Sequence, residues 1–294
     1  MSRFSDTLSQ LYQQHGGDYQ GEPVCCHYPK IALYGRDQPQ QSTPVMYPQG
    51  MAVLAQGRKQ VRFGQQRFDY DNQDILLIAT SYPIECHSFA SKSQPMLGMY
   101  LPFELPLLRP MVAQLQQQHG DSYFAPYQGS GVDKLRRNEA LHQALNQLAQ
   151  ALLQPASANA LAPHWLAIIY YQLLTGPKRH LLAALVQQDQ HLARISASIE
   201  HIQQNLEQKL TVEQLAQVAG MSESAFFRAF KASVADSPLQ YLKKLRLNKA
   251  KGLIVYQGMA ASAAAFAVGY ESATQFSREF KRYFGTPPSK IPAL

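Results

Sequence analysis

The stretch VGYESATQFSREFKRYFGTPP, residues 268–288, decides the fold because the chain contains a second copy of its pattern. Its aromatic residues recur at helical spacing among positive charges, which by itself predicts only a basic amphipathic helix. The stretch AGMSESAFFRAFK, residues 219–231, repeats the order of residue types. Each matching position lies 50 residues upstream, namely Ser222, Phe226, Arg228, Phe230 and Lys231 against Ser272, Phe276, Arg278, Phe280 and Lys281. The repeat indicates a duplicated structural unit.

Each copy predicts two helices joined by a tight turn. Gly220 and Gly269 follow the first helix of their copies, where a left-handed residue is favoured. An alanine four residues earlier, Ala216 or Ala265, leaves room for the two helices to approach closely. Ser222 is then placed to cap the start of the next helix. This arrangement is typical of a helix-turn-helix.

The second helix of each copy has two faces when its residues are placed at intervals of about 100°. The inner faces carry Phe226, Ala229, Phe230 and Ser233 in the first copy and Phe276, Phe280 and Tyr283 in the second. The outer faces carry Ser224, Phe227, Arg228 and Lys231 in the first copy and Thr274, Ser277, Arg278 and Lys281 in the second. Arginine suits bidentate contact with guanine or phosphate, hydroxyls reach phosphate oxygens or base edges, and lysine adds a charge. Because both copies share these residue types, the outer faces predict contact with nucleic acid.

Phe227 is the exception on these outer faces. It lies near the border of the inner side, so two interpretations stay open: a core residue, or a residue that stacks on a sugar or contacts a thymine methyl group. Ser277 occupies its place in the second copy. We therefore expect the two copies to contact DNA differently.

The segment between the copies predicts one long helix. Ser237 is a good N-cap and Pro238 suits the first helical position. Leu242, Leu245, the stem of Arg246 and Leu253 are expected to pack against both copies, and Lys243, Lys244, Lys249 and Lys251 are expected to be exposed. A rigid spacer of this kind sets two helices about one DNA turn apart, roughly 34 Å.

The charge of the chain is concentrated in the same region. The formal net charge is +7, and residues 195–294 hold 12 Lys and Arg against 7 Asp and Glu, a balance of +5. Residues 1–194 hold 15 against 13, a balance of +2. A basic end suits an anionic partner such as nucleic acid.

The first hundred residues predict β structure, because short apolar runs such as KIALYG, MAVLAQG and DILLIAT alternate with turn residues. From about Leu105 the apolar spacing becomes helical. We expect a β-rich domain at 1–108, a helical connector or dimerisation region at 109–190, and a DNA-binding domain at 191–294. The fold class is α+β, an antiparallel barrel or sandwich followed by an all-α domain.

Within the connector, residues 132–153 predict a helix and residues 152–163, LLQPASANALAP, predict a loop. The helix has an apolar seam formed by Leu135, Leu141, Leu145, Leu148 and Leu152. Two interpretations stay open for the seam, an interface between two copies of the chain and packing within one copy.

Composition excludes several classes of protein. No apolar run reaches the length of about 18 residues that a membrane span needs, and the N-terminus lacks the apolar core of a signal peptide, so we expect a cytoplasmic protein without membrane contact. Cys25, Cys26 and Cys86 fit neither a disulfide framework nor a C-x-x-C site. We predict no catalytic residue, no metal site and no cofactor.

The C-terminal residues resemble the DNA-binding domain of the AraC/XylS family of bacterial transcription regulators, from about Ile195 to Pro288. The elements Gly-Tyr-Glu-Ser, Phe-Ser-Arg-Glu-Phe-Lys and Phe-Gly-x-x-Pro of the second copy carry most of this resemblance. It implies a sequence-specific regulator that binds promoter DNA in the major groove, with RNA polymerase as a further partner. The DNA-binding residues that we predict are Ser222, Ser224, Phe227, Arg228, Lys231, Ser272, Ala273, Thr274, Ser277, Arg278 and Lys281. Ala273 has no polar group to read a base.

Much of residues 20–177 resembles the AraC-type N-terminal module, a cupin-like barrel that senses a small molecule. The stretches TPVMYPQGMAVLAQGRKQVRFG and YPIECHSFASKSQPMLGMYLP carry this similarity. It implies an unidentified small-molecule effector and a homodimer as an open option. Regulators with this module include aldehyde-responsive ones, so Cys86 is either an electrophile-sensing thiol or a buried inert cysteine.

The main alternative is a metal-dependent cupin-type enzyme fused to a DNA-binding domain. Such a site needs several His and a carboxylate converging on one metal. The only clusters here are Cys25, Cys26 and His27, and Glu85, Cys86 and His87, whose neighbouring side chains point to opposite faces of a strand. An alkyl-transfer repair protein would need a multi-cysteine metal site, which the sequence lacks. We therefore expect that the protein is not an enzyme.

Overall fold

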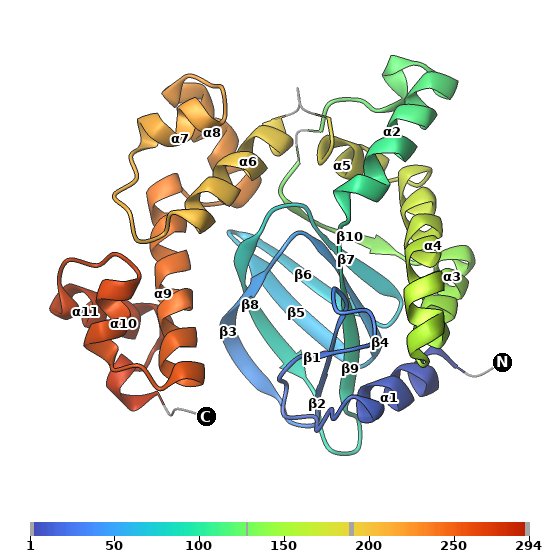
Figure 1. The fold of residues 1–294 in the computed structure, drawn as a ribbon, viewed down its shortest axis with the longest axis horizontal. Helices are drawn as coiled ribbons and strands as arrows, with labels where there is room; N and C mark the ends of the chain where they lie inside the picture. The colour runs from blue at the N-terminus through green and yellow to red at the C-terminus, as the bar shows by residue number, and fades with distance from the viewer. Residues whose placement is uncertain (1–2, 128, 188–190, 292–294) are drawn as a thin grey trace.

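The fold is seen in a computed structural model that describes residues 3–127, 129–187 and 191–291. A barrel of two β-sheets lies between two helical regions (Figure 1). Helices from the first 187 residues pack on one side of the barrel, and the all-helical C-terminal third lies on the other side. The α+β fold class is as the sequence predicts.

Both sheets of the barrel are antiparallel. The six-stranded sheet has the order β1-β2-β9-β4-β7-β10 and the four-stranded sheet has the order β3-β8-β5-β6. Its strands are β1 (Val24–Cys25), β2 (Ala32–Arg36), β3 (Gln40–Tyr47), β4 (Gly50–Gln56), β5 (Arg58–Phe63), β6 (Gln66–Asp71), β7 (Asp74–Ile78), β8 (Tyr82–Phe89), β9 (Met96–Pro102) and β10 (Val132–Arg136).

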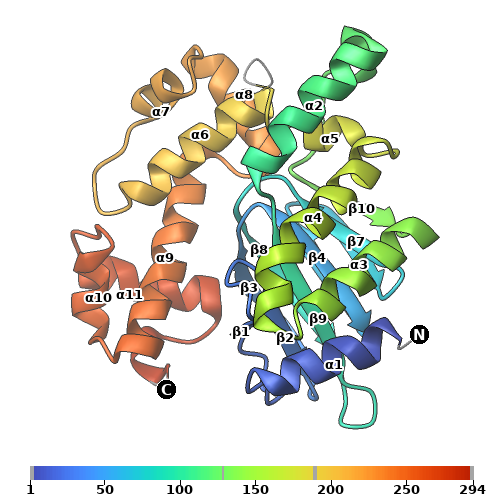
Figure 2. The same ribbon diagram turned by 45° about the vertical axis from the view of Figure 1, so that its right-hand side comes forward.

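The six-stranded sheet is buried on both faces, because its central strands are apolar at almost every position. In β4, Met51 and Val53 belong to the core under the helices, and Ala52 and Leu54 belong to the core between the sheets. This alternation follows from the two-residue period of a strand. The covering helices lie along one face (Figure 2): α1 (Phe4–Gln14), α2 (Leu105–His119), the 3-10 turn η1 (Asp121–Tyr123), α3 (Glu139–Ala151), α4 (Pro155–Leu174) and α5 (Arg179–Ala184).

Three local predictions for residues 1–187 were wrong. Residues 4–14 form a helix within the stretch expected to be β. The helix expected from 132 starts at Glu139, because residues 132–136 form β10 and pair with β7. The loop expected at 152–163 is mostly helical, because Pro155 occupies the first position of α4 and the alanine-rich run after it favours helix.

The leucine seam is resolved in favour of packing within one copy. Leu141, Leu145, Leu148 and Leu152 are at most 3% exposed and belong to the core under the six-stranded sheet. A second chain therefore has no access to this seam in the folded protein.

The C-terminal third is helical throughout its described residues, 191–291. It contains α6 (His191–Gln204), α7 (Val212–Val218), α8 (Glu223–Val234), α9 (Pro238–Gln257), α10 (Ala261–Ala267), α11 (Ala273–Phe284) and the 3-10 turn η2 (Pro288–Lys290). The boundary expected at residue 190 falls on residues 188–190, outside the described residues. No helix in the described part of the chain is long and apolar enough to cross a membrane.

Candidate nucleic-acid interface and barrel cavity

The C-terminal third contains two helix-turn-helix units, as the repeat predicts. Unit 1 is α7 with α8, and unit 2 is α10 with α11. Gly220 and Gly269 have φ angles of 60° and 85°, the left-handed region that favours glycine. A Cβ atom on Gly269 would lie 2.5 Å from the carbonyl oxygen of Glu207. The alanines at the close approach, Ala216 and Ala265, are buried.

The two serines at the start of the second helices act as N-caps. Ser222 Oγ accepts a hydrogen bond from the backbone N–H of Ala225 at 3.4 Å, and Ser272 Oγ accepts one from Gln275 at 3.3 Å. The predicted cap at Ser222 is confirmed. Each cap satisfies a backbone donor that the helix leaves free.

The inner and outer faces of α8 and α11 are as the sequence predicts. Phe226, Phe230, Phe276 and Phe280 are fully buried. Most of the predicted DNA-contacting side chains are exposed: Ser224, Phe227, Arg228, Lys231, Thr274, Arg278 and Lys281. Ala273 and Ser277 are half-buried. Phe227 is 41% exposed, so the interpretation as a core residue was wrong.

Unit 2 has an acidic anchor that unit 1 lacks. Glu279 on the flank of α11 accepts hydrogen bonds from Tyr270 Oη at 2.9 Å and pairs with Lys243 Nζ at 3.0 Å. Burial of the carboxyl opposes ionisation, but the hydrogen bonds from Lys243, Tyr270 and Gln275 outweigh it and lower the pKa of Glu279. The matching residue of unit 1, Ala229, cannot form such contacts.

The connecting helix α9 starts at Pro238 with Ser237 as its N-cap, as predicted. The expectation of four exposed lysines was wrong for three of them. Lys243 pairs with Glu279, Lys244 pairs with Asp236 at 2.6 Å, and Lys251 is half-buried over the ring of Phe284. Lys249 is exposed. Most of the positive charge on α9 therefore holds the fold together.

Arg246 fixes α9 against the end of α6. Its guanidinium donates to the carbonyl oxygen of Leu206 at 2.7 Å and to that of Gln208 at 2.8 Å. The sequence suggested only that the aliphatic stem of Arg246 packs. These carbonyls follow a helix end, where backbone acceptors lack internal partners.

The turn after unit 1 and the first part of α9 are joined to the barrel by a cluster of polar contacts, which we call the latch: Tyr82 and Ser81 of the barrel with Asp236, Tyr241 and Lys244. Tyr82 Oη donates to Asp236 Oδ2, and Lys244 Nζ donates to Tyr82 Oη at 2.9 Å. Tyr241 Oη donates to the carbonyl oxygen of Ser81 at 2.6 Å. No local sequence signal indicated the latch, because its members lie more than 150 positions apart.

Aromatic rings continue this junction from the barrel to the second helix of unit 1. Ring centroids are separated by 4.9 Å between Phe63 and Tyr82, 6.0 Å between Tyr82 and Tyr241, and 5.6 Å between Tyr241 and Phe230. Phe230 lies on the inner face of α8. The core between the sheets and the core of unit 1 are thus continuous.

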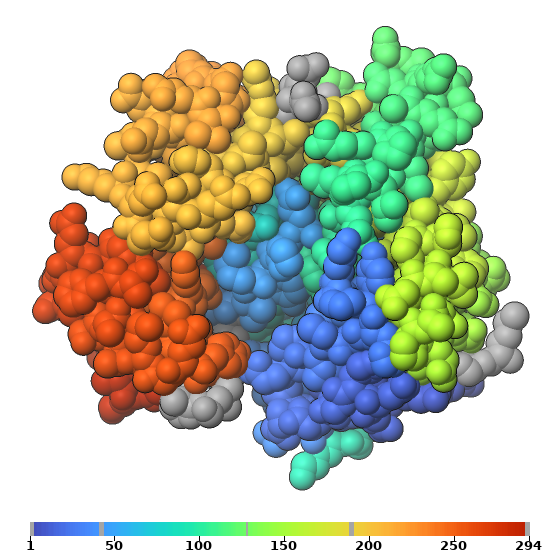
Figure 3. Space-filling model, in the orientation of Figure 1, coloured from blue at the N-terminus to red at the C-terminus, as the bar shows by residue number. Residues whose placement is uncertain are grey.

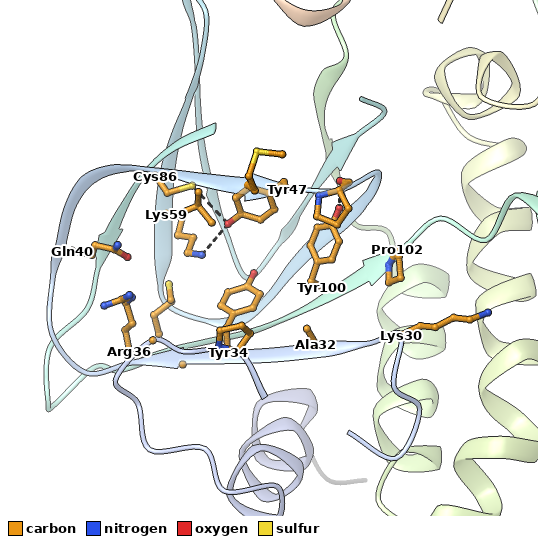
Figure 4. A pocket seen from close by; sticks show the side chains of 17 residues that line it. Lys30, Ala32, Tyr34, Arg36, Gln40, Tyr47, Lys59, Cys86, Tyr100 and Pro102 are labelled. Carbon is orange, nitrogen blue, oxygen red and sulfur yellow. Dashed lines mark hydrogen bonds between the residues drawn. The ribbon is translucent and has the colours of Figure 1, made fainter. Parts of the chain in front are cut away.

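The barrel encloses a cavity of about 340 Å³, a volume in the range of small-molecule sites. Figure 4 shows the side chains of Lys59, Cys86, Tyr34, Tyr47 and Tyr100 converging on it from five different strands. Lys59 is 6% exposed and was missed from the sequence. The only sequence signal was its position between polar neighbours on a strand, KQVRF, which is equally typical of an exposed lysine.

Cys86 lies in the wall of this cavity. Its Sγ donates a hydrogen bond to Tyr47 Oη at 3.7 Å, and the residue is 1% exposed. Burial raises the pKa of the Cys86 thiol, while nearby Lys59 acts in the opposite direction. The net upward shift keeps the thiol protonated at neutral pH, the less nucleophilic form.

A groove adjoins the cavity on the side of α9. It has a volume of about 600 Å³ and shares Arg36, Val45 and Met46 with the cavity. In Figure 3 a hollow lies between the barrel and the C-terminal helices. The mouth of the barrel therefore faces the helix that connects the two units.

The residues described offer no group of three His, Cys, Asp or Glu placed to hold a metal ion. Cys25 is exposed, whereas Cys26 is buried and donates to the carbonyl oxygen of Tyr28. The two neighbouring thiols thus face different surroundings, with Cys25 in β1 and Cys26 directly after it.

Most of the chain matches two known protein families. Residues 27–181 match the family described as AraC-type transcriptional regulator N-terminus, and residues 215–292 match a helix-turn-helix domain. The first match alone covers more than half of the chain.

Relatives in other bacteria are regulators. A protein of Haemophilus influenzae described as an uncharacterized HTH-type transcriptional regulator is 26% identical over 309 residues, which cover 98% of this chain and 97% of the relative. The probable transcriptional regulator LumQ of Photobacterium leiognathi is 28% identical over 206 residues, which cover 69% of this chain and 74% of the relative.

Among solved structures, ToxT from Vibrio cholerae has a similar fold. One ToxT structure, described as bound to an unsaturated fatty acid, superposes with a TM-score of 0.62 at 8% sequence identity and covers 88% of this chain and 93% of ToxT. At this identity the likeness concerns the fold. The arrangement of a barrel beside two helix-turn-helix units is thus shared.

Proposed function

The chain belongs to the AraC-type transcriptional regulators, and from this premise we propose how it acts: α8 and α11 enter two successive major-groove segments of promoter DNA, and the barrel controls them. The observation that carries the proposal is the pair of exposed outer faces, each built on a helix whose buried phenylalanines fix its orientation. We keep the three-part division at 1–108, 109–190 and 191–294 as part of this proposal.

Each outer face has a separate task in this proposal. Arg228 and Arg278 read bases or clamp phosphates, and Lys231 and Lys281 contribute phosphate contacts. Ser224, Thr274 and Ser277 supply short hydroxyl contacts, Phe227 makes apolar contact with a sugar or a thymine methyl, Ala273 lets the backbone approach closely, and the caps Ser222 and Ser272 aim the helix N-termini at the DNA backbone.

We infer that the cavity binds a small-molecule effector. β8 supports this because it contributes Cys86 to the cavity wall and Tyr82 to the latch. A ligand that moves β8 acts on unit 1 through a contact already present. A sensing thiol at Cys86 remains a second option within this proposal, although its protonated state disfavours fast reaction with electrophiles.

Other partners follow from the family and from one surface. We propose that this chain is a cytoplasmic regulator and that RNA polymerase is a further partner. For a homodimer, the outer face of α4 is the candidate interface, because Leu161, Ile168 and Tyr171 are exposed at helical spacing. Leu161→Glu with Ile168→Glu is expected to give a monomer in sedimentation, and the exposed Glu139→Gln serves as the control. An unchanged sedimentation coefficient would exclude this face.

The control variant Glu139→Gln changes the charge of the neighbouring helix α3 without touching the α4 stripe, so it should sediment like the wild type. The apolar stripe is thereby separated from a general effect of charge on this side of the molecule.

Selection of binding sites from random DNA, followed by footprinting, tests the DNA-binding proposal. We expect one chain to protect two segments about one helical turn apart, roughly 34 Å, with binding that weakens steeply as salt rises. A double variant, Arg228→Ala with Arg278→Ala, should lose the selected sequence and keep only weak non-specific binding. A footprint limited to one segment, or a double variant that selects the same sequence, would contradict the proposed arrangement.

A further inference from the structure

Lys59 is a buried cation without an acidic partner among the described residues. It is 6% exposed, and its Nζ donates to Tyr47 Oη at 3.3 Å and lies 4.2 Å from the centre of the Tyr34 ring. No Asp or Glu lines the cavity in the described part of the chain, whereas Arg36 adds a second positive charge. A buried charge is costly unless it is paired.

The charge persists at neutral pH. Burial lowers the pKa of Lys59 to about 8, and nearby Arg36 acts in the same direction. This pKa lies above neutral pH, so the protonated amine predominates at pH 7. One neutral hydroxyl and one ring face do not saturate the three donors of an ammonium group.

Three phenols and the amide of Gln40 also line the cavity, and Tyr100 Oη already donates to the carbonyl oxygen of Pro48. Burial raises the pKa of the phenols of Tyr34, Tyr47 and Tyr100, so they stay neutral and keep their hydrogens. Tyr47 Oη accepts a hydrogen bond from Lys59 at 3.3 Å and lies 3.7 Å from Cys86 Sγ. The polar end of the cavity is thus suited to an acceptor that carries negative charge.

The rest of the cavity is apolar and small. Val45, Met46 and Met96 line it, and its volume is about 340 Å³. Lys30 also borders the cavity, but it pairs with Glu104, and Figure 4 shows its side chain pointing away from Lys59. Lys59 is therefore the deeply buried cation at one end of an apolar space, and Arg36 is a half-buried cation that also lines it.

We propose that the effector is an organic monoanion, a carboxylate on a compact apolar body, with its carboxylate at Lys59 and Tyr47 and its body against Val45, Met46 and Met96. This inference rests on the proposed role of the cavity as the effector site and adds the chemical class of the ligand. One ammonium group and one phenol match the two oxygens of a carboxylate.

The test compares matched probes on the full-length protein, 4-phenylbutyrate and its neutral isostere 4-phenylbutanamide, by calorimetry and thermal shift. We expect the acid to bind the wild type at least ten times more tightly than the amide. In Lys59→Met this preference should disappear, and in Lys59→Arg it should largely remain, because arginine keeps the charge. Circular dichroism checks that both variants fold, and the acid–amide ratio within each variant removes any common loss of affinity.

Val45→Trp, which fills the cavity, separates failure of the anion inference from failure of the proposed site. If acid and amide bind equally and both are lost in Val45→Trp, the cavity binds another class of ligand and the anion inference alone is wrong. If no probe binds, or if Val45→Trp changes nothing, the cavity is not the site and both fail. Trapping of 4-phenylbutanal on Lys59 by borohydride, without any preference for the acid, would assign a carbonyl compound instead of an anion.

Discussion

The two helix-turn-helix units share one sequence pattern but have different surroundings. The core of unit 1, with Phe226 and Phe230, is continuous with the core between the sheets of the barrel. The core of unit 2, with Phe276 and Phe280, forms a separate cluster with part of α9. Figure 1 shows unit 1 beside α6 above the barrel and unit 2 at the far end of α9.

The repeat therefore determines the local fold of each unit. The contacts that hold each unit against the rest of the protein differ between the two. Unit 1 is held by the latch and by aromatic rings that reach into the barrel, so a change in the barrel reaches it directly. Unit 2 depends on its own small core and on the pair between Glu279 and Lys243.

The largest effect is expected from truncating the buried anchor of each unit. Phe230→Ala and Phe280→Ala should each cost about 3–5 kcal/mol of local stability. Because the core of unit 1 is shared, Phe230→Ala should also increase hydrogen exchange in β8, whereas Phe280→Ala should increase it only in residues 247–291. Increased exchange in β8 of both variants would show that the two cores are not energetically separate.

Removing either outer-face arginine should weaken specific DNA binding by about 1–3 kcal/mol. Arg228→Ala should relax sequence preference in one segment of the selected site, and Arg278→Ala in the other. Titration of labelled DNA with substitutions in each segment measures this. Lys92→Ala, an exposed change on the barrel, is the matched control and should bind like the wild type. If both arginine variants bind like the wild type, the outer faces are assigned wrongly.

Loss of the latch should affect unit 1 selectively. Tyr82→Phe keeps the ring but removes the hydroxyl that contacts Asp236 and Lys244, at an expected cost of about 1–2 kcal/mol. Hydrogen exchange should rise in α8 and the first turns of α9. Tyr256→Phe is the control, because Tyr256 Oη makes an exposed contact with Glu22 and its loss should be nearly neutral. Equal effects of the two variants would argue against the latch.

Acid should weaken unit 2 before unit 1. The pKa of Glu279 is lowered in the fold, so its contribution is present above the unfolded value of about 4.3 and is lost as pH falls further. Glu279→Gln should cost roughly 1 kcal/mol at pH 7 and remove part of the acid sensitivity of unit 2. Hydrogen exchange of α11 at pH 6 and pH 4 measures this. The same acid sensitivity in the variant would assign it to another group.

The local features of the two units were predictable because each depends on nearby residues. The turn glycines, the caps and the inner phenylalanines are set by spacing within about 15 positions. The predictions failed where a distant partner decides. Residues 132–136 have a helical pattern but complete the edge of a sheet beside β7, and Lys243 and Lys244 read as exposed until Glu279 and Asp236 are brought to them.

The α+β class, the duplicated unit, the buried and exposed faces of α8 and α11, and the family could all be inferred from the order of the amino acids, because these follow from local periodicity and conformational preference. The packing of the folded chain was needed to show that Phe227 is exposed, that the leucine seam is buried, that Cys86 and Lys59 face one cavity, and that Tyr82 contacts Asp236. The physical reason is the same in each case. Burial and pairing of charge depend on which strands and helices pack together, and contacts across 150 positions leave no trace in local spacing.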